Sequence, residues 1–253
     1  MDRSVTIVTG GACGIGTAIS RRMLKEGDVI LVGRTRRHLE ALRDERMADG
    51  PPYAHIVAGD VADPMTATHV AVECRHHGYR HVRLVSNAGI GKSEATHSFD
   101  PMMWKRIFDV NVHGAFHLVQ ALLPLMLERD GGAICFMSSL AGLRGLSHDA
   151  AYVASKHALV GFAKALGKEY GARGIHTVAL CPGFVESAMT DRSVASLARR
   201  HGSDLEEARR RIERASPLRR VLTQEEVAET VAFVTSPMGA AFNGTAIDMS
   251  GGQ

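Results

Sequence analysis

The chain alternates short apolar runs, rich in β-branched residues, with longer segments that carry a helical pattern. The runs cover residues 5–8, 29–32, 55–58, 82–86, 133–138, 176–180 and 245–249. Continuously apolar strands joined by helical crossovers are typical of a parallel sheet that is buried on both faces. The sequence therefore predicts an α/β fold, a doubly wound seven-stranded parallel sheet with helices on both faces. Ligands in such folds bind outside the carboxyl ends of the strands.

A single domain over residues 1–253 is expected, because 45% hydrophobic content at this length supports one large core and no repeat or linker interrupts the chain. Residues 188–216 break the alternation, are rich in Arg and Glu, and are interpreted as an inserted substrate lid. Within this segment Ser203 and Glu206 have the spacing of a helix capping box.

The charge pattern and the start of the chain narrow the choice of partners and compartment. The net charge is only +3 and the basic residues are scattered, so we expect no nucleic-acid partner. The chain runs from Met1 directly into a strand pattern, with no long apolar run, which predicts a cytoplasmic protein without a membrane partner.

No metal site is expected from the sequence. The four cysteines are far apart and form no CxxC pair, so they are interpreted as core thiols or chance occurrences in a reducing compartment. Among the 13 histidines, His113 and His117 have helical i, i+4 spacing, but neither an HExxH motif nor a nearby carboxylate ligand accompanies them.

A glycine-rich loop, Thr9-Gly10-Gly11-Ala12-Cys13-Gly14-Ile15-Gly16, directly follows the first strand and precedes a helix. Glycines at this place let the backbone turn sharply and let a pyrophosphate approach the N–H groups of the following helix. Such loops also serve as plain turns, but the position between the first strand and the first helix favours dinucleotide binding through Thr9, Gly10, Gly14, Ile15 and Gly16.

The end of the second strand distinguishes the two nicotinamide cofactors, because an acidic residue there would repel a 2′-phosphate. Gly33 takes that place and Arg34 follows, with Arg36 and Arg37 close behind. A guanidinium suits a phosphate, so NADP(H) is favoured and NAD(H) is possible. The alternative is that these arginines only decorate a solvated helix start.

Tyr152 and Lys156 open a predicted helix with i, i+4 spacing, which places the phenol and the ammonium on one face. Ser139 ends the strand that comes before this helix, where side chains face the ligand crevice. A phenol that acts as acid and base near neutrality needs a lowered pKa, which Lys156 and an oxidised nicotinamide would supply. A Tyr-x-x-x-Lys pattern by itself also occurs by chance at ordinary helix starts.

Taken together, the motifs resemble the short-chain dehydrogenase/reductase family over essentially the whole chain, with the Rossmann arrangement of the sheet. The motifs, in order, are residues 9–16, Asp60-Val61, Asn87-Ala88-Gly89, Asn111, Ser138-Ser139, residues 152–156 and Pro182-Gly183.

The resemblance also implies a role for each matching residue. Asp60 and Val61 would contact adenine, and residues 87–89 would shape the crevice. Asn111 would kink a helix and hold a water, Ser139 would bond the substrate oxygen, and Tyr152 would be the acid/base. Lys156 would hold the nicotinamide ribose, tune Tyr152 and relay protons with Asn111. Pro182 and Gly183 would also line the cofactor site, and the Val185 backbone would bond the carboxamide.

Three positions depart from the pattern of the family. Ser86 stands where a second Asn is frequent, Ser187 stands where a Thr usually bonds the carboxamide, and Cys13 replaces a Ser or a basic residue. The first two keep a polar group, and Ser187 is therefore kept among the cofactor-binding candidates. Cys13 carries no charge, which leaves most of the preference for NADP(H) to Arg34.

The predicted function is that of an NADP(H)-dependent oxidoreductase that moves a hydride between the nicotinamide and the carbon of a carbonyl or secondary alcohol. One alternative is a non-catalytic regulator that senses NADP(H). Another is an NAD-dependent enzyme of 3-hydroxybutyrate-like hydroxy acids, but the Gln near Gly91 and the His near Ala141 that such a resemblance would require are absent. The general pattern is more similar to 3-oxoacyl-carrier-protein reductases, and the sequence does not specify the substrate.

Two further features concern substrate and partners. The arginines of the 188–216 segment could attract an anionic substrate, but interspersed glutamates favour an exposed helix with internal charge pairs. Apolar segments 116–127 and 158–166 exceed what one crossover must bury, and with the family resemblance they predict a homotetramer or a homodimer.

Overall fold

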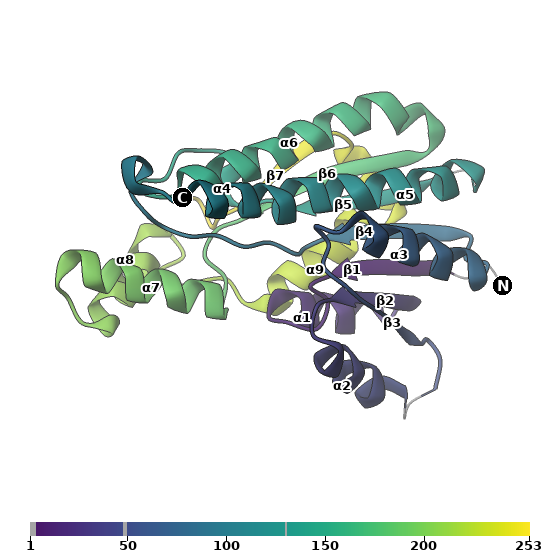
Figure 1. Ribbon diagram of the computed structural model, residues 1–253, viewed down its shortest axis with the longest axis horizontal. Helices are drawn as coiled ribbons and strands as arrows, with labels where there is room; N and C mark the ends of the chain where they lie inside the picture. The colour runs from purple at the N-terminus through teal and green to yellow at the C-terminus, as the bar shows by residue number, and fades with distance from the viewer. Residues whose placement is uncertain (1–3, 48–49, 130) are drawn as a thin grey trace.

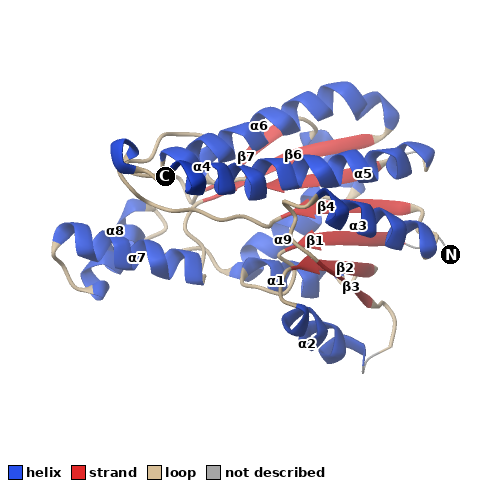
Figure 2. Ribbon diagram, in the orientation of Figure 1, coloured by secondary structure: helices blue, strands red, loops and turns tan. Residues whose placement is uncertain are grey.

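The computed structural model describes residues 4–47, 50–129 and 131–253, and these ranges contain one parallel sheet (Figures 1 and 2). Its seven strands lie in the order β3-β2-β1-β4-β5-β6-β7. The bounds are β1 Ser4–Thr9, β2 Asp28–Gly33, β3 Ala54–Ala58, β4 His81–Ser86, β5 Gly132–Met137, β6 Ile175–Pro182 and β7 Thr245–Met249. The order reverses between β1 and β4, so a crevice opens there at the carboxyl edge. The predicted fold class is confirmed.

Helices cover both faces of the sheet (Figure 1). Side chains from α3 (Pro64–His76), α5 (Gly114–Glu128) and α6 (Ala150–Tyr170) build one apolar core, and α4 (Pro101–Phe108) leads into α5. Side chains from α1 (Ile15–Met23), α2 (Arg36–Met47) and α9 (Gln224–Val234) build the other. Ile7 and Val8 are adjacent in β1 but belong to opposite cores, because strand side chains alternate between faces.

The helical stretch Pro101–Glu128 joins α4 and α5 through a π-helical turn over Asp109–His113. By length and composition alone, this stretch is long and apolar enough to span a membrane. Half of its most apolar window is buried inside the fold, where Leu118, Leu122 and Leu125 belong to the core beneath the sheet. A buried core helix accounts for the same composition.

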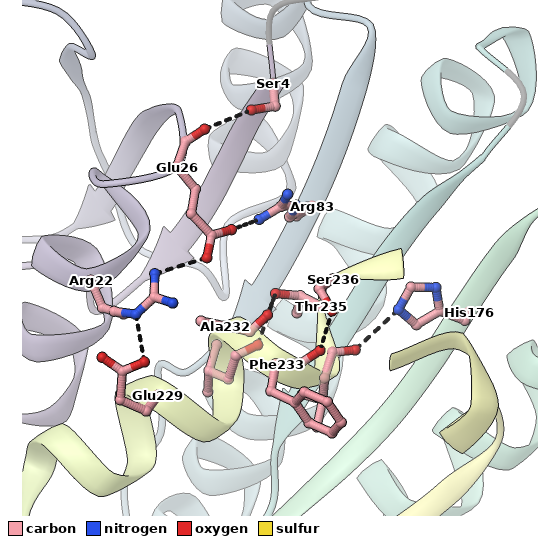
Figure 3. A network of polar contacts seen from close by, with 12 residues as sticks. Ser4, Arg22, Glu26, Arg83, His176, Glu229, Ala232, Phe233, Thr235 and Ser236 are labelled. Atoms are coloured by element: carbon pink, nitrogen blue, oxygen red, sulfur yellow. Dashed lines mark hydrogen bonds and ion pairs between the residues drawn. The ribbon is translucent and has the colours of Figure 1, made fainter. Parts of the chain in front are cut away.

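An ion-pair network joins the last turn of α1 and the turn after it to α9 and β4 (Figure 3). Arg22 of α1 donates to Glu26 at 2.8 Å and to Glu229 of α9 at 2.7 Å, and Arg83 of β4 also bonds Glu26. The two arginines hold the pKa of Glu26 below its usual value against the opposing effect of burial. The network therefore fastens α1 and α9 to the edge of the sheet opposite the crevice.

Residues 188–215 form two helices, α7 (Ala188–His201) and α8 (Leu205–Ala215), which extend from the main body at the carboxyl edge (Figure 1). They share a small core of their own with Val221, separate from the two cores of the sheet. The predicted capping box is wrong: Asp204 is the N-cap of α8, and its carboxylate accepts a bond from the Glu207 N–H at 2.7 Å.

The arginines of α8 are paired with acids, as the exposed-helix interpretation anticipates. Arg210 lies 3.1 Å from Glu206, and Arg209 lies 2.9 Å from Asp191 of α7. These pairs are exposed and each contributes about 1 kcal/mol or less to stability. They orient α7 and α8 more than they stabilise the fold.

Candidate active site

The glycine-rich loop forms the floor of the crevice between β1 and α1. Gly14 is the N-cap of α1 with φ 52° and ψ −128°, a conformation that favours glycine, and no side chain caps the helix there. A Cβ added to Gly16 would lie 2.0 Å from the carbonyl oxygen of Gly10. The loop therefore brings bare backbone to the positive end of α1, which suits a bound pyrophosphate.

Asn87 and Ala88 follow β4 and close the loop from the other side of the crevice. The Thr9 hydroxyl oxygen accepts bonds from their N–H groups at 2.9 and 2.8 Å. The Asn87 amide donates to the Thr9 carbonyl at 2.9 Å. These bonds fix the spacing between the carboxyl ends of β1 and β4, where the order of strands reverses.

Arg34 is exposed directly after β2, at the place where the adenosine ribose would lie. Its charge contributes to holding the pKa of Asp60 low, so the two side chains lie near each other. Arg36 begins α2 and faces Glu40 at 3.6 Å, and the Cys13 thiol lies 3.9 Å from the His38 ring. Of the three arginines, Arg34 is the one whose charge acts on Asp60.

Asp60 and Val61 follow β3. The Asp60 carboxylate accepts bonds from the Ala62 N–H at 3.0 Å and from the Arg106 guanidinium of α4. Val61 is buried, and a Cβ on Gly114 would lie 2.9 Å from its methyl group. This pair thus joins β3 to α4 and α5, which places one wall of the crevice.

Asn111 lies in the π-helical turn and is buried. Its side-chain oxygen accepts from the Ile90 N–H at 2.9 Å, and its amide donates to the Ile90 carbonyl and to the Ser155 hydroxyl, both at 2.9 Å. The widened turn aims the amide across the crevice, as π-bulges at functional sites do. A Cβ on Gly89 would lie within 3.4 Å of both this oxygen and the Lys156 ammonium, so Asn111 and Lys156 approach each other closely over that glycine.

Lys156 is almost completely buried on α6, and its ammonium donates to the Met137 carbonyl at 2.6 Å. Burial lowers the pKa of Lys156 to about 8. Ser138 donates to the Lys156 carbonyl at 2.9 Å, which joins the end of β5 to the same helical turn. The Lys156 nitrogen lies 5.5 Å from the centre of the Tyr152 ring, on the helix face the spacing predicted.

Tyr152 and Ser139 meet at the mouth of the site. The Ser139 hydroxyl lies near enough to the phenol to lower its pKa, and a Cβ on Gly91 would lie 2.9 Å from the Tyr152 ring, so bare backbone packs against the phenol. Burial, with a smaller contribution from the Asp149 carboxylate, raises the pKa of Tyr152 to about 12, and the nearby Ser139 hydroxyl opposes this rise. In the chain by itself desolvation outweighs the favourable contacts, and the lowering of this pKa by Lys156 together with an oxidised nicotinamide stays a prediction.

The segment after β6 contains the remaining residues that are predicted to contact the cofactor. Gly183 donates to the Met249 carbonyl at 3.0 Å, and Val185 forms an isolated bridge with Leu222. Ser187 is the N-cap of α7: its oxygen accepts from the Thr190 N–H at 3.3 Å and its hydroxyl donates to the Val185 carbonyl at 3.1 Å. Ser187 thus already anchors the first turn of α7 at the edge of the crevice.

Comparisons with known proteins agree with this geometry. The family model for short chain dehydrogenases matches residues 4–198. This chain belongs to the short-chain dehydrogenase family. A 2-(S)-hydroxypropyl-CoM dehydrogenase of Xanthobacter autotrophicus is 32% identical, over 100% of this chain and 97% of that protein.

Two solved structures superpose on the whole short-chain dehydrogenase fold. A single-residue variant of actinorhodin polyketide ketoreductase with NADPH has a TM-score of 0.92 at 33% identity, covering 99% of this chain and 97% of that one. L-sorbose reductase from Gluconobacter frateurii with NADPH and L-sorbose has a TM-score of 0.90 at 28% identity, covering 100% and 98%. The family predicted from the motifs is confirmed, and the chain is an oxidoreductase.

Sequence reasoning about this short-chain dehydrogenase missed several neighbours of the site. Arg106 and Gly91 come close to Asp60 and Tyr152 only in the folded chain, and Ser155 bonds Asn111 across the crevice. Ser155 lies inside the Tyr-to-Lys motif and could have been selected, since position i+3 on a helix lies beside position i. Arg106 carries no such signal, because it reaches Asp60 from a different crossover.

Proposed function

We propose that this chain is an NADPH-dependent ketoreductase, working in reverse as a secondary-alcohol dehydrogenase. The observation that carries the proposal is the convergence of Ser139, Tyr152, Lys156 and Asn111 at the carboxyl edge of β5, beside the glycine-rich loop. A regulator that only senses a dinucleotide needs no buried ammonium beside a phenol, so turnover is favoured over sensing.

The residues on the crevice fit NADP(H), which supplies the hydride for the carbonyl carbon. Gly10, Gly14, Ile15 and Gly16 would hold the pyrophosphate at the start of α1. Arg34 would bond the 2′-phosphate. Further candidate contacts to the adenine, ribose and carboxamide parts are Thr9, Asp60, Val61, Asn87, Ala88, Gly89, Tyr152, Lys156, Pro182, Gly183, Val185 and Ser187. Both solved neighbours named above hold NADPH, which supports the preference over NAD(H).

Proton transfer is assigned to the chain's own side chains. Ser139 and Tyr152 would hold the substrate oxygen between their hydroxyls, and Tyr152 would donate its proton to that oxygen in the direction of reduction. The raised pKa of Tyr152 keeps the phenol protonated at neutral pH, which suits a proton donor. The Lys156 ammonium would stabilise the phenolate left behind, and Asn111 would help return a proton through water.

The substrate is assigned as a small ketone or secondary alcohol. We propose that α7 and α8 act as the lid of a single domain that covers it, and that the protein works in the cytoplasm. A spectrophotometric assay of NADPH and NADH consumption over a panel of neutral ketones, hydroxyketones and 3-oxoacyl thioesters tests the function. The expected result is saturable oxidation of NADPH with at least one class. Binding of NADPH without any turnover across the panel would support the sensing alternative.

Replacing Arg34 by Ser is expected to reduce kcat/KM for NADPH about 10- to 100-fold, because a charge-assisted hydrogen bond contributes about 1.5–3 kcal/mol. The value for NADH should change less than about threefold, since that cofactor has no 2′-phosphate. Arg36→Ser is the matched control, because Arg36 already faces Glu40. Equal losses with both cofactors would show that Arg34 does not read the phosphate.

The apolar surface of α4 and α5 supports self-association. Met102 is 71% exposed and Phe116 is 46% exposed, on consecutive parts of one helical stretch. We propose a homodimer or homotetramer through this face, and size-exclusion chromatography with light scattering should give two or four times the chain mass. Phe116→Glu should lower that mass, whereas Val72→Glu on the exposed side of α3 should not. A monomeric wild type at micromolar concentration would refute the proposal.

A further inference from the structure

A second group of chemically active side chains lies at the amino edge of the sheet, opposite the crevice. His55 is the second residue of β3, Glu73 lies near the end of α3, and His77 is the C-cap of that helix. One donor atom from each lies within 4.8 Å of the others. The sequence analysis expected no metal site and considered a different pair, His113 and His117; in the structure, His113 instead lies 3.1 Å from Asp109.

The distances within the group match those of a metal site. The Glu73 carboxylate oxygen lies 3.1 Å from Nε2 of His77 and 3.8 Å from Nδ1 of His55. Zinc bonds of about 2.0–2.1 Å at tetrahedral angles place neighbouring donor atoms about 3.3–3.4 Å apart. The Glu73–His77 pair is already near this spacing, and a rotation of the His55 side chain would bring the third donor, which lies within 4.8 Å of the other two, to the same ion.

A carboxylate lies behind the first of these histidines, on the side away from Glu73. If Nδ1 of His55 faces the ion, its other ring nitrogen faces Asp28, whose carboxylate lies 3.9 Å away. Asp28 is itself held by the Tyr79 hydroxyl and the Tyr53 N–H, both at 2.8 Å. Zinc-bound histidines regularly donate their other ring N–H to a carboxylate, and Asp28 is the carboxylate placed to accept that bond once the His55 ring turns toward an ion.

The group is also accessible. The side chains of His55, Glu73 and His77 are 19%, 32% and 23% exposed, and a cleft of about 350 Å³ lined by His55 and Glu73 leads to them. Arg43 lines the same cleft, but its guanidinium bonds Asp44 at 2.8 Å. A fourth coordination position would open into this cleft, where water can complete a tetrahedron.

We propose that His55, Glu73 and His77 form a binding site for a divalent transition metal ion, with Zn²⁺ as the best match to a two-histidine, one-carboxylate donor set. The ion fastens the carboxyl end of α3 to the amino end of β3. This site lies at the edge of the sheet opposite Ser139 and Tyr152, so the proposal does not depend on the ketoreductase assignment. The role of the ion here is to stabilise the fold.

Titration of tag-free, chelator-treated protein with ZnCl₂ in a calorimeter tests the site. The expected result is one saturable Zn²⁺ per chain, together with a rise of several degrees in Tm, since a ligand that binds only the native state stabilises it. Co²⁺ as a probe should give the visible absorption of a tetrahedral complex. A titration without saturable binding, or with an octahedral Co²⁺ spectrum only, would overturn the proposal.

Single substitutions separate this site from the other histidines. His55→Gln, Glu73→Gln and His77→Gln should each weaken Zn²⁺ binding at least about tenfold and remove the tetrahedral Co²⁺ spectrum. His69→Gln, exposed on the same helix, should bind like the wild type. Far-ultraviolet circular dichroism of the metal-free variants checks that each one folds. Equal weakening by His69→Gln would assign the binding to scattered surface imidazoles and overturn the proposal.

Discussion

Tyr152→Phe is expected to reduce turnover in ketone reduction about 10²- to 10⁴-fold, the range for removal of a positioned acid/base group. The phenol lies beside Ser139 and is the group to which we assign the proton. NADPH affinity should change little, because the loop and Arg34 are untouched. Steady-state kinetics together with fluorescence titration of NADPH measures both quantities.

The control for this variant is Tyr170→Phe, at the other end of α6. It should keep wild-type turnover, and both variants should melt within a few degrees of the wild type, since each loses one hydroxyl, worth about 1 kcal/mol. Near-normal turnover of Tyr152→Phe would remove Tyr152 from the mechanism and leave the ketoreductase proposal without its proton donor.

Lys156→Met is expected to lose a similar factor, about 10²- to 10⁴-fold in turnover, because the phenolate of Tyr152 then has no cation beside it. The large loss of turnover should come without a large loss in the stability of the variant.

The pKa of Lys156 is lowered to about 8 from its ordinary value of 10.5, so the folded state disfavours the ammonium. This penalty is complete below about pH 8 and fades as the pH rises toward 10.5. Methionine removes the penalty, which offsets the lost bond to the Met137 carbonyl.

The pH dependence of reduction gives an independent check on Lys156. In the wild type, turnover should fall above about pH 8 as the ammonium loses its proton, while Tyr152 stays protonated well beyond that pH. The Lys156→Met variant should have a lower turnover at every pH, and this turnover should not fall further above about pH 8. Melting curves at pH 7 should give a Tm equal to or above that of the wild type. A variant that unfolds at pH 7, or that keeps the same pH profile, would contradict this role.

Most of the fold could be predicted from local sequence. The seven apolar runs mark the strands to within one or two residues at most ends, because a strand buried on both faces requires apolar side chains throughout. The continuous helical stretch from α4 to α5 and the two-helix form of residues 188–215 were not anticipated. Helix ends depend on single capping contacts. Both Ser203 and Asp204 are residue types that cap helices, and only the bond from the Glu207 N–H to the Asp204 carboxylate shows which one caps α8.

The site divides in the same way. Residues whose chemistry is carried by a local motif were identified from the sequence: Tyr152 with Lys156 on one helix face, and the glycines before α1. Residues that act across the fold were not identified, such as Arg106 beside Asp60 or His55 beside Glu73 and His77. The raised pKa of Tyr152 in the chain by itself could not be predicted from the sequence either, since it depends on how much water the surrounding chain excludes.

The sequence by itself predicted the succession of strands and helices along the chain, carried the motifs that resemble the family, and pointed to Tyr152 with Lys156 as candidates for moving a proton. These follow from periodicities and spacings of a few residues, which fix local geometry. Tertiary structure decided which distant side chains meet, the pKa of each buried group, and the donor set at the amino edge of the sheet. Those properties depend on distances between segments and on exclusion of water, and both are set only when the helices pack against the sheet.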